Sequence, residues 1–238
     1  MEASAQVRPV GKAVSIVQQV VQSKASGGGG AALSSGDSIY HGRQLRASAS
    51  SRGEFELQDE TRLVLNANSS LLLDDLVVGG GVSFAKLSLN AVSGAFRFIS
   101  GNSPSEAYKI STAVSTLGIR GTAFDVYVGR GGETAVMLLR GRVQICRRAG
   151  VRTEESCEEL SRRCQIALSE RASDNVELLE TGQQDVAGVP LEAAFPFAAN
   201  QSVLNPEFRV RGASSCFSRR AILRDRLRIR QQLRLTRQ

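Results

Sequence analysis

The sequence predicts an all-β fold, and three observations support this prediction. Short apolar segments recur roughly every 8 to 12 residues between Gly36 and Cys146, with turn-forming residues between them. Apolar and polar side chains alternate within these segments, which is the pattern of half-buried strands. No helical period competes with this alternation in the same region. Helix is therefore expected only in a short C-terminal segment.

The first expected element is a strand over residues 11–21, followed by a Ser- and Gly-rich loop over residues 23–30. A loop that cradles phosphate needs a Lys-Ser or Lys-Thr pair after its glycines, with a helix behind it. Here Ala31, Ala32 and Leu33 follow the glycines. The stretch is therefore interpreted as a surface loop.

The strands expected between Gly36 and Cys146 are marked by apolar residues at alternate positions. Turns are expected at 58–61, 66–69 and 79–81, where Asp, Asn, Ser and Gly gather. The apolar pairs are Leu63 and Leu65, Leu71 and Leu73, Leu87 and Leu89, Phe96 and Phe98, Val136 and Leu138, and Val143 and Ile145.

The most strongly specified stretch is residues 109–128. Gly118 and Gly121 flank a bend, and glycine tolerates positive φ and close backbone approach, so we interpret this segment as a corner between strands. After it, Phe124 begins an alternating strand and is expected in the core. Thr122 is expected to satisfy backbone groups at the turn.

Arg120 lies inside this corner and has two interpretations. Its guanidinium could hold the corner by donating to carbonyls or to a carboxylate, or it could contact an anionic ligand. We favour the structural role. This interpretation predicts that Arg120→Ala lowers the melting temperature substantially.

Three segments carry a resemblance to the FecR-like domain family. The corner reads GIRGT over residues 118–122 and leads into AFDVYV. Residues 55–63 read FELQDETRL, and residues 86–100 read KLSLNAVSGAFRFIS, which ends in G-x-F-R-F. In this order the segments resemble the family from about Val10 to Cys146.

The resemblance implies an elongated β-roll or β-helix-like architecture, with a β-sandwich as the alternative. It also implies a domain of periplasmic or extracytoplasmic signalling proteins, best known from regulators that relay the state of an outer-membrane receptor to a sigma factor. The anti-sigma helices and the transmembrane segment of those regulators are not recognised in this sequence. The relay function is therefore not carried over as it stands.

The domain organisation is expected in four parts. Residues 1–9 are a leader, residues 10–146 the FecR-like β domain, residues 147–206 a cysteine-bearing extension with a few strands and an irregular connection, and residues 207–238 an arginine-rich tail. Within the leader, Ala3-Ser4-Ala5 fits the end of a secretory signal peptide, although no apolar segment precedes it. We expect an exported, periplasmic protein whose signal peptide is missing from the given sequence, with a short disordered leader as the alternative.

The net charge of +7 over 238 residues is unevenly distributed. From Arg209 onwards there are ten arginines and one acidic residue, so the preceding 208 residues carry a net charge of −2. A nucleic-acid function would therefore depend on the tail alone, and the tail has no interleaved aromatic residues to stack bases.

Ser218 is a plausible N-cap for a tail helix that extends to about Thr236. Its interpretations are a solvated terminal helix and a contact with an anionic surface such as acidic lipid head groups. The arginines proposed for that contact are Arg219, Arg220, Arg224 and Arg228.

The four cysteines indicate disulfides, since their number is even and the expected compartment is oxidising. Four cysteines allow three connectivities. We expect either Cys146 or Cys157 to pair with Cys164 and so staple the segment after the last confident strand. Zinc is disfavoured because no C-x-x-C pair occurs and the only histidine is distant in sequence.

Catalytic chemistry is not expected. His41 is the only imidazole available to a triad and is interpreted as a turn residue. The carboxylate pairs Asp59-Glu60 and Asp74-Asp75 are not expected to form an acid–base dyad, because adjacent strand residues point to opposite faces, and both pairs are interpreted as turn residues. No cofactor, metal or small-molecule substrate is predicted.

The leading functional hypothesis is a non-enzymatic exported FecR-domain protein that acts as a binding, scaffold or signalling module at the bacterial cell envelope. Its expected partner is another envelope protein. One alternative is a sensor component that relays a signal to a sigma/anti-sigma system through a separate membrane partner. The other alternative is a nucleic-acid binder that uses the basic tail.

Overall fold

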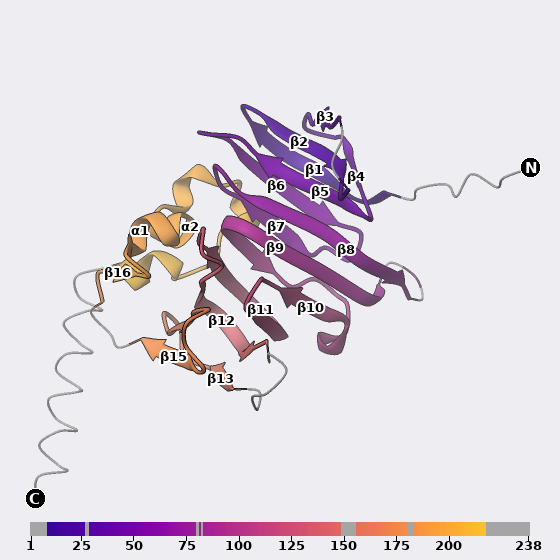
Figure 1. The fold of residues 1–238 in the computed structure, drawn as a ribbon. Coiled ribbons are helices and arrows are strands. Elements are labelled where there is room, and N and C mark those ends of the chain that lie inside the picture. Colours follow the sequence, from indigo (N-terminus) through magenta and orange to yellow (C-terminus); the bar gives the residue numbers. More distant parts are fainter. Residues whose placement is uncertain are drawn as a thin grey trace, which may run out of the picture.

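The computed structural model confirms the all-β prediction. One sheet of 15 strands dominates the molecule, and only short helices occur, near the C-terminal end of the described chain (Figure 1). The residues that the structure describes are 9–26, 29–79, 81, 83–148, 156–179 and 183–217.

The sheet bends back on itself to form two layers, as the strand pairings show. The first layer contains, in spatial order, β4 (Ser38–Tyr40), β1 (Pro9–Val17), β6 (Arg52–Leu57), β7 (Arg62–Leu65), the second part of β9 (Phe84–Ile99), the second part of β11 (Ser115–Val128), the first part of β12 (Thr134–Arg147), β14 (Ile166–Ser169) and β15 (Val176–Leu179).

The second layer lies across the core from the first. It contains β3 (Ala31–Ala32), β2 (Val20–Lys24), β5 (Arg43–Ala47), β8 (Ser70–Val78), the first part of β9, β10 (Tyr108–Ser111), the first part of β11, the second part of β12 and β13 (Cys157–Leu160). Only β9 and β10 pair in parallel among the described strands. The 3-10 turn η1 (Ser105–Ala107) leads into β10.

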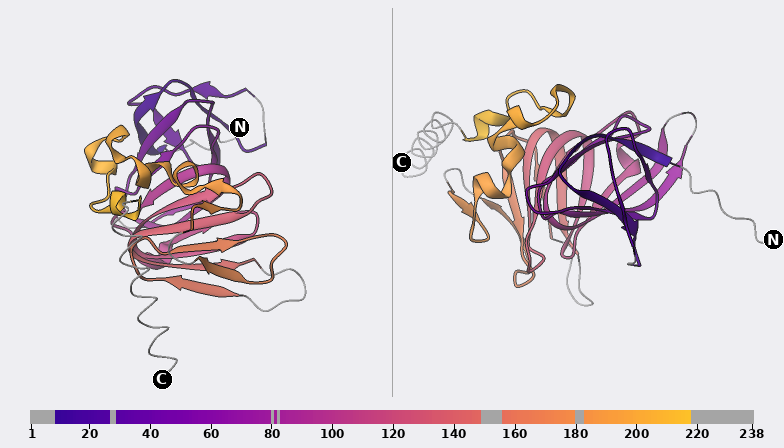
Figure 2. Two further views of the ribbon diagram at one scale, coloured as in Figure 1. Left: turned by 90° about the vertical axis from the view of Figure 1, so that its left-hand side faces the viewer. Right: turned by 90° about the horizontal axis from the view of Figure 1, so that it is seen from above.

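Long strands serve both layers because each bends at a glycine. Gly94 in β9, Gly121 in β11 and Gly141 in β12 have φ angles of +96°, +54° and +84°, which side chains rarely adopt. The apolar side chains that point inward from both layers form one large core, which includes Phe55, Phe124 and many Leu and Val residues. The architecture is thus a flattened roll made from one bent sheet, as the resemblance implied, rather than two separate sheets (Figure 2).

The expected single strand at residues 11–21 is in fact two strands. Gln18 has a φ of +58° and separates β1 in the first layer from β2 in the second. The prediction of one strand was wrong because the chain turns at Gln18 from the first layer to the second. The apolar pattern continues through this turn because both strands contribute to the same core.

A C-terminal cap, defined here as residues 183–217, covers part of the outer face of the first layer (Figures 1 and 2). Sequence analysis expected an irregular connection over most of this region, but it folds into short helical turns packed on the sheet. Its elements are β16 (Asp185–Val186), β17 (Val189–Pro190), α1 (Leu191–Ala194), α2 (Pro196–Ala199), η2 (Gln201–Val203), η3 (Pro206–Phe208) and η4 (Ala213–Phe217).

The cap forms because its apolar side chains have a matching surface. Phe195 and Val210 pack on a cluster of sheet residues that includes Met137 and Leu139, and all four are at most 5% exposed. These turns are too short to be stable alone, so tertiary packing selects them. The tail helix expected over residues 218–236 lies outside the described residues.

Candidate functional site

The corner at residues 118–122 is where β11 passes from the second layer to the first. The Oγ of Ser100 accepts a hydrogen bond of 3.0 Å from the Thr122 amide, and the Thr122 hydroxyl donates to the carbonyl of Arg140. Opposite it, Gly141 approaches so closely that a Cβ there would lie 2.4 Å from the Gly121 carbonyl oxygen. Backbone contacts and Thr122 therefore hold the corner together.

Phe124 follows the corner and is fully buried. Its ring stacks on Phe98 with a centroid distance of 5.3 Å, and Phe98 in turn meets Tyr108 edge to face at 5.6 Å. These three rings come from β11, β9 and β10 and fill the core next to the corner.

The surroundings of Arg120 do not support the structural role that we favoured for it. Its side chain is exposed, and no hydrogen bond or ion pair joins it to any described residue. Gly118 is exposed as well and does not have a positive φ. The strand alternation explains both positions, because Leu117 and Ile119 point into the core and their neighbours point outward.

An open groove of about 590 Å³ lies on this outward face of the second layer. Such a volume is typical of sites that hold a small ligand or a short segment of a partner. The groove is lined by residues of η1, β10, β11, β12 and β13: Ser105, Glu106, Tyr108, Lys109, Thr116, Leu117, Gly118, Ile119, Arg120, Arg142, Gln144, Cys146 and Glu159.

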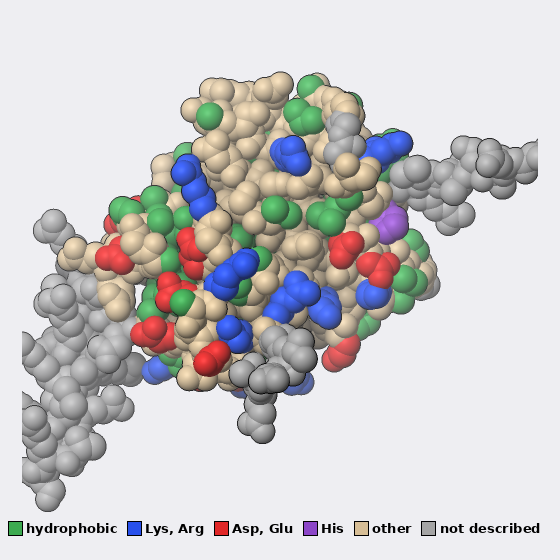
Figure 3. All heavy atoms as spheres, in the orientation of Figure 1, with side chains coloured by type: hydrophobic (Ala, Val, Ile, Leu, Met, Phe, Trp, Pro, Cys, Tyr) green, Lys and Arg blue, Asp and Glu red, His purple; other side chains and the backbone are tan. Residues whose placement is uncertain are grey.

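The charge of the groove is mainly positive. Lys109, Arg120 and Arg142 are exposed cations, whereas Glu106 and Glu159 are its only acidic lining residues. Arg142 and Glu159 form an exposed ion pair of 3.4 Å, and such pairs contribute little. Figure 3 shows Lys and Arg side chains gathered on the face that carries β10 and β11. We refer to this site as the basic groove.

The basic groove has the cations needed to bind an anion. Its guanidinium and ammonium groups donate hydrogen bonds and accept none. His41 is exposed in the turn between β4 and β5, away from the groove residues in the fold. Within the described residues, no group of three His, Cys, Asp or Glu could hold a metal ion.

Asp59, from the first carboxylate pair, lies in a turn as predicted and is fully buried. Its carboxylate accepts hydrogen bonds from the Thr61 amide at 3.0 Å, the Ser103 hydroxyl at 2.6 Å and the Tyr108 hydroxyl at 2.8 Å. Burial raises the pKa of the Tyr108 hydroxyl. These hydrogen bonds satisfy the Asp59 carboxylate and connect the β6–β7 turn to Ser103 and to Tyr108, the first residue of β10.

Asp74 and Asp75, the second pair, lie in β8 rather than in a turn. The strand is irregular between Leu73 and Asp75, and Asp75 pairs with Lys86 of β9 at 2.5 Å. The sequence predicts a turn here because aspartate is common in turns. The cross-strand ion pair with Lys86 instead accommodates Asp75 on the exposed face.

The outer face of the first layer contains a buried ion pair beneath the cap. Arg97 of the G-x-F-R-F segment donates to both carboxylate oxygens of Asp125, at 2.7 and 2.8 Å, and both side chains are at most 1% exposed. Arg97 also donates to the Gln201 side-chain oxygen at 3.0 Å and to the Phe208 carbonyl at 3.4 Å. Its guanidinium lies 5.8 Å from the centroid of the Phe197 ring.

Burial raises the pKa of Asp125, and the charge of Arg97 opposes that shift. A neutral Asp125 would leave the buried guanidinium of Arg97 without its counterion, so removal of either partner should destabilise the fold. Sequence analysis did not identify it. The two residues occupy the outward positions of alternating strands, but only the fold shows that a cap covers that face.

Two disulfides are present, which confirms the expectation of disulfides but not the expected partners. Cys146 bonds to Cys157, and Cys164 bonds to Cys216. The first pair faces each other directly across β12 and β13. Cys164 lies in the turn after β13 with a φ of +67° and reaches the cap instead. Sequence spacing could not reveal that the cap returns to this turn.

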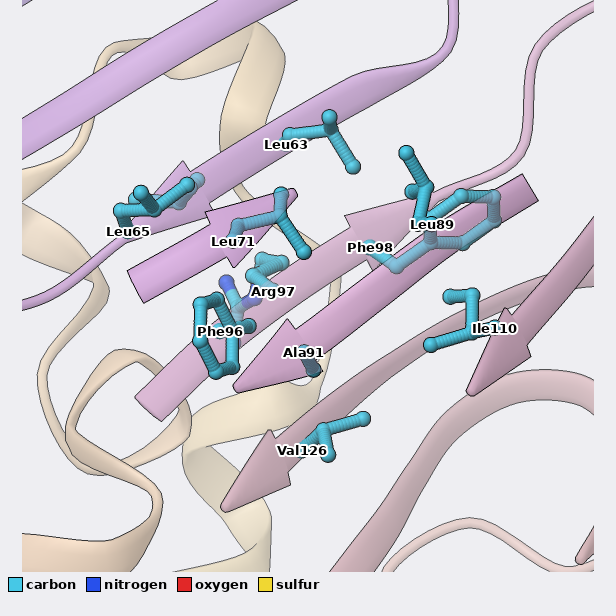
Figure 4. Close-up of a pocket in the computed structure, with 11 residues that line it drawn as sticks. Leu63, Leu65, Leu71, Leu89, Ala91, Phe96, Arg97, Phe98, Ile110 and Val126 are labelled. Carbon is cyan, nitrogen blue, oxygen red and sulfur yellow. The ribbon is translucent and has the colours of Figure 1, made fainter. Parts of the chain in front are cut away.

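A small cavity of about 20 Å³ in the core is lined by apolar side chains and by Arg97 (Figure 4). It has room for about one water molecule, far less than the volume of a typical ligand site. The proposed lipid-contact arginines Arg219, Arg220, Arg224 and Arg228 lie outside the described residues. No helix in the described ranges has the length and apolar character needed to cross a membrane.

Comparisons with known proteins show which family part of the chain is similar to. Residues 43–144 match the FecR protein family. This match includes the corner, the G-x-F-R-F segment and three groove cations, and it ends before the cap. No curated protein matches the chain.

Two crystal structures of a candidate anti-sigma factor from Parabacteroides distasonis ATCC 8503, at 1.65 and 2.50 Å resolution, are similar to this chain at 15% sequence identity. Their TM-scores are 0.42 and 0.43. Each match covers 57% of this chain and 58% of the other, so the chain spans less than two thirds of these relatives.

Proposed function

Because residues 43–144 are a FecR domain, we propose that this protein is a non-enzymatic, exported signalling module that binds another protein at the bacterial cell envelope. The observation that carries the proposal is the basic groove, which the FecR domain presents on an open face of its sheet. The C-terminal cap covers the opposite layer and leaves this face free.

The two disulfides support export. The Cys146–Cys157 bond joins two neighbouring strands that are 11 residues apart in sequence. The Cys164–Cys216 bond joins segments that are 52 residues apart. Disulfides of this kind form and persist in oxidising compartments such as the bacterial periplasm. The described part of the chain contains no free cysteine.

A more specific form of the proposal is a sensor that signals to a sigma/anti-sigma system through a separate membrane partner. The resemblance to the FecR family favours this form, since the family is best known in such regulators. Binding of nucleic acid by the arginine-rich tail is disfavoured, because an exported protein would not meet nucleic acid. A tail contact with anionic lipid stays a prediction.

The test is localisation followed by capture of partners. The protein, tagged at its C-terminus and expressed from its own gene in its native host, should fractionate with the periplasm or envelope. Chemical cross-linking of intact cells and mass spectrometry should then identify an envelope protein that an exported control protein with the same tag does not capture. Retention of the native protein in the cytoplasm with reduced cysteines would contradict the proposal.

A further inference from the structure

Gly118 lines the basic groove, and neither its backbone conformation nor the space around it requires a glycine there. Its φ is not positive, and a Cβ built on it would meet only the side chain of Gln144, at 3.8 Å. Glycine weakens a strand interior, and where neither space nor backbone conformation requires it, it often marks a place where another chain or ligand approaches closely. Gly121 and Gly141 differ, because positive φ angles require glycine there.

The cations around Gly118 are arranged at a cost to the free protein. Arg120 of β11 lies directly opposite Arg142 of β12, and like charges in such positions destabilise a sheet. Lys109 of β10 lies opposite Gly118, diagonal to Arg120. An anion placed between the two guanidinium groups would remove the repulsion and accept hydrogen bonds from both.

The acidic residues of the groove limit what that anion can be. Glu106 and Glu159 belong to the lining, from η1 and β13, and both are exposed. Their charges disfavour a polyanion or a flat anionic membrane, which would extend over them. A short segment with a single carboxylate among neutral groups fits the central cations. Its carboxylate can bind Arg120, which pairs with no described residue, and share Arg142 with Glu159, which lies 3.4 Å from that guanidinium.

We therefore infer that the basic groove binds an acidic peptide segment of a partner protein, an inference that rests on the proposed function. A carboxylate of the peptide lies between Arg120 and Arg142, and its backbone lies against Gly118, where no side chain stands in the way. The amide of Gln144 and the hydroxyl of Thr116 are available to hydrogen-bond that backbone.

The test uses the full, disulfide-bonded chain and a display library of random seven-residue peptides. We expect enriched peptides to share an Asp or Glu. A synthetic copy of the most enriched peptide should bind in a fluorescence anisotropy assay, and replacing its acidic residue with the matching amide should weaken binding about tenfold or more, as loss of a charged hydrogen-bond partner does.

The decisive variant is Gly118→Val, because it alters no charge. The arginine-rich tail also attracts acidic peptides, so loss of charge alone would not locate the site. Gly118→Val should abolish binding and leave the melting temperature unchanged or higher. Arg120→Glu should also weaken binding, whereas Arg46→Glu, on an exposed arginine of β5, should not.

Several outcomes would overturn the inference. These are no enrichment, enrichment of peptides that lack an acid, binding that Gly118→Val does not affect, or displacement of the peptide by phosphatidylglycerol vesicles or inorganic phosphate at similar concentrations. The proposed function is tested separately by envelope cross-linking. If Gly118→Val still captures the wild-type partner, the proposed function stands and the groove inference fails.

Discussion

At the scale of single residues, the corner of β11 separates side chains that hold the fold from side chains available for binding. Gly121 and Thr122 hold the corner through backbone conformation and hydrogen bonds. Gly118 and Arg120 lie on the exposed face and contribute to the groove. Gly121 is distinguished by its positive φ and Thr122 by its burial, although all four residues lie within five positions of sequence.

Glycine substitutions should reveal this difference in thermal melts. Gly141→Ala should lower the free energy of unfolding by about 1–3 kcal/mol or more, because a side chain would be strained at positive φ and would meet the Gly121 carbonyl. Gly118→Ala should leave stability unchanged or slightly raised, since alanine restricts the unfolded chain. Equal losses at both positions would show that Gly118 is structural.

Arg120→Ala should leave the melting temperature nearly unchanged. The side chain is exposed and pairs with no described residue, and exposed substitutions usually change stability by less than about 0.5 kcal/mol. This expectation reverses the one drawn from sequence. Lys24→Ala, on an exposed cation of β2 that pairs with no described residue, provides a matched control for differential scanning calorimetry. A loss of several degrees only for Arg120→Ala would restore the structural role.

The buried ion pair should be much more sensitive. Asp125→Asn would leave Arg97 charged and without its counterion beneath the cap, which typically costs about 3–5 kcal/mol. Urea denaturation would measure the loss. The double variant Arg97→Met with Asp125→Leu should lose less than the sum of the single variants, and full additivity would contradict a coupled pair.

At the scale of elements, the C-terminal cap is an addition beyond the matched FecR region that the first layer holds in place. Three kinds of contact attach it: apolar side chains, the hydrogen bonds from Arg97, and the Cys164–Cys216 disulfide. One more hydrogen bond joins the cap to the sheet, because the Asn205 amide donates to the buried carboxylate of Glu54 at 3.2 Å.

Removing the cap disulfide should loosen the cap first. Cys164→Ser with Cys216→Ser should lower the free energy of unfolding by roughly 2–4 kcal/mol, the usual range for disulfides. Limited proteolysis should then cleave residues 183–217 before the sheet. The Cys146→Ser and Cys157→Ser double variant serves as a comparison, because it removes the disulfide that closes the shorter loop and lies outside the cap, and it should leave the cap protected. Equal protection of the cap in both variants would contradict this attachment.

Glu54 should make the cap interface dependent on pH. Burial raises its pKa in the folded protein, while Asn205 and Arg52 oppose the shift. The folded state therefore binds the proton more readily than the unfolded chain, and this residue's contribution to stability falls as pH rises through and above its ordinary range near 4.5.

Glu54→Gln should remove that dependence. The stability of the variant relative to wild type should increase between about pH 4 and pH 7, as measured by urea denaturation at each pH, because glutamine does not ionise. Glu56→Gln on the same strand, at a partly exposed position, is the matched control. A constant difference across this range would show that Glu54 does not titrate differently on folding.

At the scale of the whole molecule, the roll has two outer faces with different roles. The cap covers part of the first layer, and the basic groove opens on the second. One disulfide adjoins each of these features, since Cys146 of the first disulfide lines the groove and Cys216 of the second belongs to the cap.

Protein isolated from its native compartment should contain no free thiol. Intact mass should rise on reduction by the mass of one hydrogen for each of the four sulfurs. Peptide mapping without reductant should recover Cys146 with Cys157 and Cys164 with Cys216. Native protein with four free thiols would argue against export.

The sequence by itself determined the β class, the corner at Gly121 and the relation to the FecR family, because alternation, turn residues and short motifs are local. Tertiary structure decided the rest. The basic groove depends on the register that places Arg120 beside Arg142, and the ion pair of Arg97 depends on a cap that is distant in sequence. Strand alternation shows which side chains share a face but not which strands become neighbours, since that depends on how the whole chain packs.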